Sequence, residues 1–146
     1  MDEMRVEPCY ACRGCEEKTY GRCVIRDDAD LILPCLARSS TIFVLTSIVF
    51  GSYSFPIKRI VDRFALLVGK HYSYHNGELT TSAKEKAPRV NYYVIGIHEG
   101  IQPEELQAFR QLVLETIRIA AWAGKSLVLP YEAAEYDAFV QEVAQA

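Results

Sequence analysis

The chain has 146 residues, enough for one ordinary domain with a hydrophobic core and too few for two. Half of the residues are hydrophobic and 24% are charged, which is typical of soluble globular proteins and excludes a disordered chain. The net charge of −3 gives no reason to expect nucleic acid as the main partner, and no apolar run approaches the roughly 20 residues that cross a membrane. The acidic start MDEMRVEPC lacks the apolar segment of a secretory signal, so we expect a cytoplasmic protein.

Residues 1–26 are predicted to form a cysteine-rich loop region ahead of an α/β core over 27–146, the two together making a single domain. Four cysteines fall within fifteen residues at the spacing C-x2-C-x2-C-x7-C, namely Cys9, Cys12, Cys15 and Cys23. In a reducing compartment, closely spaced cysteines indicate metal or redox chemistry more often than disulfides. Four thiolates suit a 4Fe–4S cluster, whereas four-cysteine zinc sites usually show two separated C-x2-C pairs. The spacing alone leaves three alternatives open: a cluster, zinc, or free thiols without metal.

A first helix is predicted to begin at Asp27-Asp28, because acidic residues at a helix start interact favourably with the helix dipole. Its apolar face would be formed by Leu31, Ile32, Cys35 and Leu36, and we expect Cys35 to lie in the core. The run TIFVLTSIVF, residues 41–50, does not alternate apolar with polar residues. This pattern predicts a strand buried on both faces, as in a parallel sheet covered by helices.

The rest of the chain continues the alternation of helix and strand. Pro56 suits the first turn of a helix that runs to about Val68, and the polar residues 70–89 are predicted to form a long surface loop. The remaining predicted elements are a strand over 90–99, a helix from Pro103 to near Gly124, a strand over 126–130 and a helix over 132–144. Strict alternation predicts a parallel sheet with right-handed crossovers, in which ligands bind beyond the carboxyl ends of the strands. Those ends are followed by residues 46–54 and 96–101.

Three stretches carry a resemblance to a known family: PCYACRGC…GRCVIRDD over 8–28, TSIVFGSYSFPIKRIVDR over 46–63, and the strand–helix–strand from Val90 to Pro130. In this order they resemble the flavodoxin-like NAD(P)H-dependent FMN reductases, including the iron–sulfur flavoproteins. The resemblance covers nearly the whole chain and implies a flavodoxin-like three-layer α/β fold.

The chain departs from that family at its start, where the first β-strand, the phosphate loop and the first helix are missing. With the flavodoxin-like strand order 2-1-3-4-5, the run Thr41–Phe50 would then lie at an edge of the sheet. A long apolar edge strand tends to pair with other chains. We therefore expect a cover for this edge. It would be a second copy in a homodimer or larger assembly, a separately encoded N-terminal fragment, or an upstream segment if the start codon is set too late.

The resemblance also implies an FMN cofactor, with NAD(P)H or an iron–sulfur cluster as the electron source and a small-molecule electron acceptor. The flavin ring would lie against two loops, formed by Thr46, Ser47, Ile48, Val49, Phe50 and Gly51 and by Gly96 and His98. Backbone N–H groups there would stabilise negative charge on the reduced ring. The plainer alternatives are an ordinary turn capped by Ser54 and a solvated His98. No catalytic residue is assigned, since the sequence holds no Walker loop, G-x-G-x-x-G or G-x-S-x-G motif.

Two functions follow from these observations. The first is a flavoprotein oxidoreductase or electron-transfer subunit. The alternative is a flavin-free scaffold of the same fold, without catalytic activity, which assembles through its exposed strand. The missing phosphate loop favours the scaffold, because loop amides and helix N-termini supply much of the affinity for the FMN phosphate. In either case Lys58 and Asp62, one helical turn apart, are predicted to form an ion pair, and together with Arg63 to have a structural or subunit-contact role. Trp122 is predicted to pack in the core or in a dimer contact.

Overall fold

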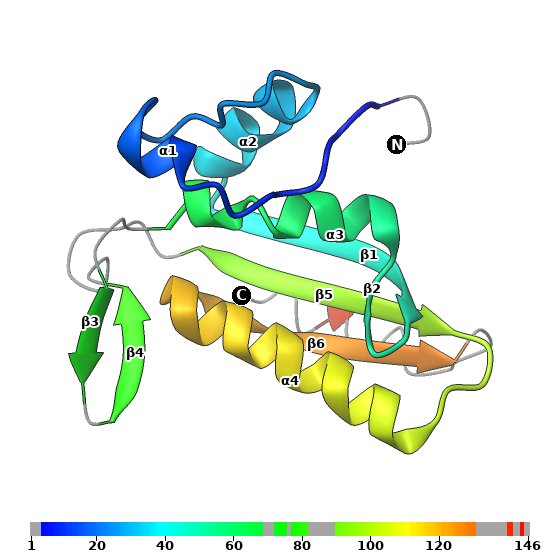
Figure 1. Cartoon of the computed structure of the whole chain (residues 1–146). Helices are drawn as coiled ribbons and strands as arrows, with labels where there is room; N and C mark the ends of the chain where they lie inside the picture. The colour runs from blue at the N-terminus through cyan, green and yellow to red at the C-terminus, as the bar shows by residue number, and fades with distance from the viewer. Residues whose placement is uncertain are drawn as a thin grey trace.

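The chain mixes helices and strands, but the strict alternation that the sequence predicts is interrupted by the short strand after β1, by a hairpin before β5 and by an extra short helix near the start (Figure 1). The computed structural model describes residues 4–68, 72–75, 77–81, 90–130, 140, 141 and 144. The elements are α1 Gly14–Glu17, α2 Ala29–Ala37, β1 Thr41–Val49, β2 Ser52–Tyr53, α3 Phe55–Val61, the 3-10 helix η1 Phe64–Leu66, β3 Tyr72–His75, β4 Glu78–Thr81, β5 Asn91–His98, α4 Pro103–Ala120 and β6 Ala123–Pro130. The predicted helix over 132–144 falls largely outside the described residues.

A four-stranded, mostly parallel sheet in the order β2-β1-β5-β6 organises the fold. The parallel register places Thr41 beside Asn91, and Asn91 beside Ala123. The short β2 runs antiparallel and pairs only with the last residues of β1, Ile48 and Val49. Over Thr41–Ser47, the outer side of β1 has no strand partner among the described residues. β1 is therefore an edge strand along most of its length, as expected.

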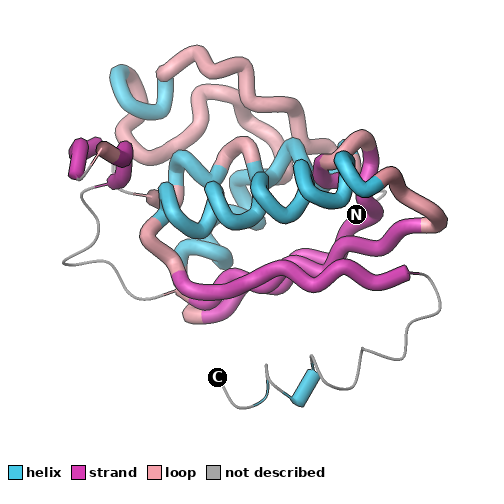
Figure 2. Tube along the Cα trace, turned by 90° about the horizontal axis from the view of Figure 1, so that it is seen from below, coloured by secondary structure: helices cyan, strands magenta, loops and turns pink. Residues whose placement is uncertain are grey.

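β1 is buried on one face only, which corrects the prediction of burial on both faces. Ile42 and Val44 are buried, whereas Phe43 and Leu45 are 55% and 62% exposed. Helices α3 and α4 lie on the same face of the sheet (Figure 2). An unbroken apolar run does not distinguish a strand between two layers from an edge strand that leaves one apolar face open. The prediction failed for that reason.

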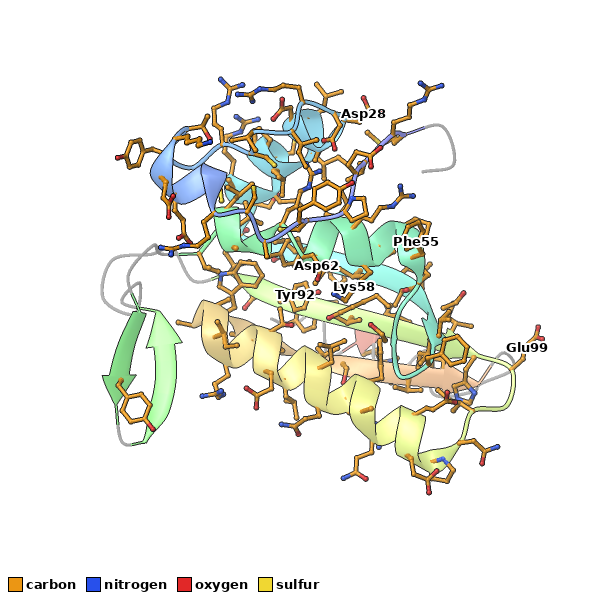
Figure 3. The ribbon with its side chains drawn as sticks, in the orientation of Figure 1. Asp28, Phe55, Lys58, Asp62, Tyr92 and Glu99 are labelled. Carbon is orange, nitrogen blue, oxygen red and sulfur yellow. The ribbon has the colours of Figure 1, made fainter. Side chains whose placement is uncertain are left out.

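The core lies between this face of the sheet and the helices that cover it. Tyr92 of β5 packs against Phe64 and Trp122, with ring centroids 5.8 and 5.5 Å away, and is seen between α3 and α4 in Figure 3. The Tyr53 and Tyr92 hydroxyls share a buried hydrogen bond of 3.2 Å, and burial raises the pKa of both groups. Trp122 is half-buried and packs against the core, which is one of the two roles predicted for it.

Helix α2 confirms only part of its predicted apolar face: Ile32 and Leu36 pack against the core, whereas Leu31 is 67% exposed. Its fully buried side chains are Ala29 and Leu33, one turn apart, and Cys35 on the same helix is exposed. The prediction that Cys35 lies in the core was therefore wrong. A helix with apolar residues at many positions does not reveal from sequence which side faces inward.

Three boundaries also differ from the prediction. The helix expected to reach Val68 ends at Val61 and continues as η1, and the expected loop 70–89 contains the hairpin β3–β4 around Gly77, whose φ is +82°. β6 begins at Ala123, because Ala121 adopts the left-handed conformation and ends α4 early. Within the described parts of the chain, no helix is long and apolar enough to cross a membrane.

Candidate functional site

A buried ion pair closes the base of the cysteine-rich loop. Arg63, at the end of α3, is 2% exposed and donates from Nη1 and Nη2 to the two Asp27 carboxylate oxygens, at 2.9 and 2.7 Å. The same Asp27 accepts hydrogen bonds from the N–H groups of Glu7 and Ala29, at 2.8 and 3.0 Å. Arg63 also donates to the Glu7 carbonyl, at 2.6 Å. Residues on both sides of the loop, before Cys9 and after Cys23, are thus held together at one point.

The hydrogen bonds at Asp27 also set its protonation. Burial alone would raise its pKa, but the hydrogen bonds from the Glu7 N–H, Arg63 and the Ala29 N–H outweigh burial and hold the pKa below 3.8. Asp27 is therefore a carboxylate at neutral pH and a permanent partner of Arg63. In the described structure the Arg63 Nε is buried without a hydrogen-bond partner, so the pair carries a desolvation cost.

All four cysteines of the loop line one hollow of about 290 Å³. The turn after α3 and η1 also line it, through Asp62, Arg63, Ala65 and Leu66. Cys9 and Cys12 are exposed, and Cys15 and Cys23 are half-buried. Ala11 and Arg13 adopt the left-handed conformation, with φ of 51° and 57°. These two turns lie on either side of Cys12 and bend the chain around the hollow. The loop therefore gathers thiols that the sequence places up to fourteen residues apart.

The thiols lie near one another but do not form a coordination sphere. Burial, together with charge repulsion from Glu16, Cys23 and Cys9, raises the pKa of Cys15, so this thiol is protonated at neutral pH. In the described part of the chain, no three His, Cys, Asp or Glu side chains are placed closely enough to hold a metal ion. The donor set fits a four-thiolate centre in kind and number. Binding requires the thiols to lose their protons and the loop to contract.

The residues predicted to contact a flavin ring meet at the carboxyl ends of β1 and β5. Thr46 lies beside Gly96 in the parallel register. Beyond them, Phe50 and Gly51 have φ of 49° and 69°, the values of a type I′ turn, and join β1 to β2 as a two-residue hairpin. Phe50 is 92% exposed, whereas Gly51 is buried against α4, where an added Cβ would lie 3.0 Å from Ala108.

Thr46 is buried and fixes the chain where it leaves the hairpin. Its hydroxyl donates to the Ser47 carbonyl and accepts from the Ser54 N–H, both at 2.9 Å. Ser54 precedes α3 without a side-chain capping bond, although its carbonyl accepts from the Lys58 N–H. Ile48 is half-buried, and Ser47 and Val49 are exposed.

In the second predicted loop, close packing explains the glycine at position 96. A Cβ at Gly96 would lie 2.7 Å from Phe109 and 2.8 Å from Ile48, so the residue allows close packing of α4 on the sheet. His98 is half-buried, and its Nδ1 is buried without a hydrogen-bond partner in the described structure. Glu99 follows at the exposed turn, where Figure 3 shows its side chain pointing away from the sheet.

The two predicted cofactor regions lie at opposite ends of α3 (Figure 1). Ser54 and Phe55 begin this helix beside the hairpin, and Asp62 and Arg63 follow its last turn beside the cysteine hollow. The predicted Lys58–Asp62 ion pair on α3 is confirmed (Figure 3). The sequence prediction missed the Asp27–Arg63 pair. Its signal was present as two acidic residues after Cys23 and a basic residue just after α3, but their contact depends on tertiary structure.

No protein-family model matches the chain, and no curated protein is similar to it in sequence.

Proposed function

We propose that the chain is a redox protein whose cysteine loop binds an iron–sulfur cluster through Cys9, Cys12, Cys15 and Cys23. The supporting observation is that all four thiols line one hollow. The ion pair between Asp27 and Arg63 holds the base of the loop, so part of the entropy cost of ordering a binding loop is already met in the folded chain. When bound, such a centre supplies one-electron chemistry, and the resemblance to flavodoxin-like FMN reductases implies an electron-transfer subunit or oxidoreductase.

The test is anaerobic reconstitution with iron and sulfide, followed by an absorption spectrum and assays of iron and acid-labile sulfide. We expect about four irons per chain, as four thiolates hold. Cys12→Ser and Cys23→Ser should lower the iron content, whereas Cys35→Ser should leave it unchanged, because Cys35 is exposed on α2 and does not line the hollow. Equal loss in all three variants, or binding of zinc alone, would contradict the cluster.

The flavin is the second part of this proposal. FMN would bind at the carboxyl ends of β1 and β5, where Ser47 and Phe50 are exposed and the His98 Nδ1 has no partner in the described structure. The support is weaker than for the cluster, because the hairpin folds Gly51 onto α4 and four hollows formed by described residues are lined by other side chains. Titration of FMN fluorescence at micromolar concentration tests this part. Because the cysteine hollow lies at the other end of α3, a chain that fails to bind FMN would leave the cluster proposal standing.

The alternative is a flavin-free scaffold that assembles through β1, and a specific observation favours it. The Asn91 N–H donates to the Ser40 carbonyl, which fixes the direction of the backbone groups along β1. The N–H and C=O groups of its even-numbered residues point toward β5, and those of its odd-numbered residues point away from the sheet. The outward-pointing set includes Phe43 and Leu45, whose side chains are also exposed, and Thr41–Val49 contains no charged residue. Natural edge strands usually carry a charge, a proline or a bulge that prevents pairing. The partner would be a second copy of the chain or a separately encoded fragment.

Analytical ultracentrifugation over a range of concentrations distinguishes self-association from a monomer. Leu45→Lys should shift a self-associating chain toward the monomer. Leu31→Lys is the matched control, because Leu31 is 67% exposed on α2 and a lysine there should not change the association. A wild-type chain that stays monomeric at all concentrations would contradict assembly with a second copy.

A further inference from the structure

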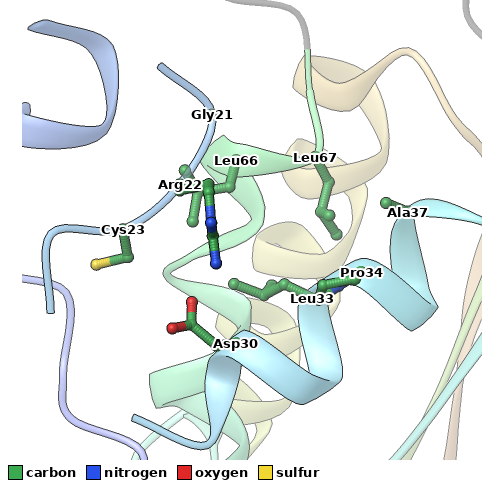
Figure 4. Close-up of a pocket in the computed structure, with 9 residues that line it drawn as sticks. All are labelled: Gly21, Arg22, Cys23, Asp30, Leu33, Pro34, Ala37, Leu66 and Leu67. Carbon is green, nitrogen blue, oxygen red and sulfur yellow. The ribbon is translucent and has the colours of Figure 1, made fainter. Parts of the chain in front are cut away.

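A second hollow lies on the other side of the cysteine loop, between residues 21–23, α2 and η1 (Figure 4). Its volume is about 250 Å³, at the small end of ligand sites. Its apolar lining comes from Leu33, Pro34 and Ala37 of α2, with Leu66 and Leu67. Pro34 and Ala37 are exposed, so this part of the helix surface is apolar without being covered by the described chain.

A single arginine reaches into this apolar hollow. Figure 4 shows the Arg22 side chain pointing toward Asp30 and Leu33. In the described structure the Arg22 guanidinium forms no hydrogen bond or ion pair, since Asp30 is paired with Arg26 at 3.2 Å instead. The planar donors of Arg22 are therefore available to a ligand. A guanidinium is well suited to bind a carboxylate through two parallel hydrogen bonds.

The backbone directs Arg22 toward the hollow. Gly21 has a φ of +80°, which favours glycine, and its N–H donates to the Cys15 carbonyl at 2.8 Å. The Thr19 hydroxyl donates to the Arg22 carbonyl. Two bonds thus fix the turn that carries Arg22, which distinguishes this residue from an arginine on an unconstrained surface loop.

We propose that this hollow binds a small apolar carboxylate, with the carboxylate on Arg22 and the hydrocarbon against Leu33, Ala37 and Leu67. The charges at the mouth agree with an anionic ligand, because Arg26 compensates Asp30 and leaves the charge of Arg22 in excess. Cys23 lines both hollows, so the ligand would lie beside one of the four thiols of the loop. The binding itself does not rest on the proposed redox function and is tested on the metal-free chain.

The test is an NMR titration of the ¹⁵N-labelled chain with 2-naphthoate, and with the uncharged 2-naphthalenemethanol as the matched probe. We expect saturable shifts at Gly21, Arg22, Ala37 and Leu67, with a dissociation constant of about 1 mM or tighter. Arg22→Gln should weaken naphthoate about tenfold to a hundredfold and leave the neutral probe unchanged. Arg38→Gln removes the same charge from the end of α2, outside the hollow, and should change neither affinity.

Two further variants test separately the space in the hollow and the charge of its lining. Ala37→Met fills the hollow from an exposed position and should abolish binding of both probes. Asp30→Asn removes a negative charge from the lining and should strengthen naphthoate binding. Three results would overturn the proposal: no saturable shift, equal affinity of the wild type and Arg22→Gln for naphthoate, or shifts centred on another surface such as β1.

Discussion

Replacing Asp27 by asparagine tests how much the loop clamp contributes to stability. Oδ1 accepts from the Ala29 N–H and Arg63 Nη1, and Oδ2 accepts from the Glu7 N–H and Arg63 Nη2. An asparagine amide has one oxygen and one NH₂ group. In either orientation the NH₂ group would face two donors, so half of these bonds are lost together with the charge. Arg63, 2% exposed, is then left as a buried charge without its counter-ion.

The expected cost of Asp27→Asn is about 3–5 kcal/mol of unfolding free energy, the usual loss when one partner of a buried ion pair is removed. Urea unfolding followed by far-ultraviolet circular dichroism measures it. Asp62→Asn is the control, because its pair with Lys58 is exposed at the surface of α3 and contributes about 0.5 kcal/mol. If Asp27→Asn costs less than about 1 kcal/mol, the pair is not the clamp inferred from its burial and hydrogen bonds.

Three other outcomes follow from the same contacts. Since the pKa of Asp27 is held below its ordinary value, its contribution to stability is present in full above about pH 5 and is lost as the pH falls through its folded-state pKa, so acid titration should show the wild type and Asp27→Asn converging. Gly124→Ala should prevent stable folding, judged by expression and circular dichroism, because its Cβ would lie 1.9 Å from the Tyr92 carbonyl oxygen. In the metal-free chain, a maleimide followed by mass spectrometry should label Cys35 before Cys15, since Cys35 is exposed and burial raises the pKa of Cys15.

The sequence predicted the longer elements of the core, because their signals are local, and missed the short α1 and β2 and the β3–β4 hairpin. Pro103 opens α4 and Pro56 lies in the first turn of α3, as expected of a residue that lacks a backbone N–H. The apolar runs over 41–50 and 90–99 are strands in the structure. The sequence did not reveal which faces of these elements pack against one another and which stay exposed. The exposure of Phe43 and of Cys35 is decided by neighbours that are distant along the chain.

The same distinction between local signals and long-range contacts applies to the candidate sites. The spacing of the cysteines predicted a possible metal or cluster site, and the structure places all four around one hollow. Gly96 was expected near a ligand but is required by Phe109 of α4, and no pattern within its own strand carries that information. That Arg22 has no ion-pair partner among the described residues could likewise not be seen in the sequence, since Asp30 is paired with Arg26 instead.

The cysteine loop combines a fixed base with adaptable thiols. Arg59 and Arg63 donate to the carbonyls of Val6 and Glu7, both at 2.6 Å, so the chain entering the loop is bonded to α3 and its C-terminal end at consecutive residues. Within the loop, Gly14 packs so closely on Val24 that an added Cβ would lie 2.6 Å away, which joins its two halves. The thiols themselves face a hollow and are not locked by a coordination sphere in the described structure. A ligand for them therefore needs to reorganise side chains and a few backbone angles rather than fold the loop from a disordered state. The Asp27–Arg63 pair meets part of the ordering cost, and Arg63 itself lines the hollow that the four thiols share.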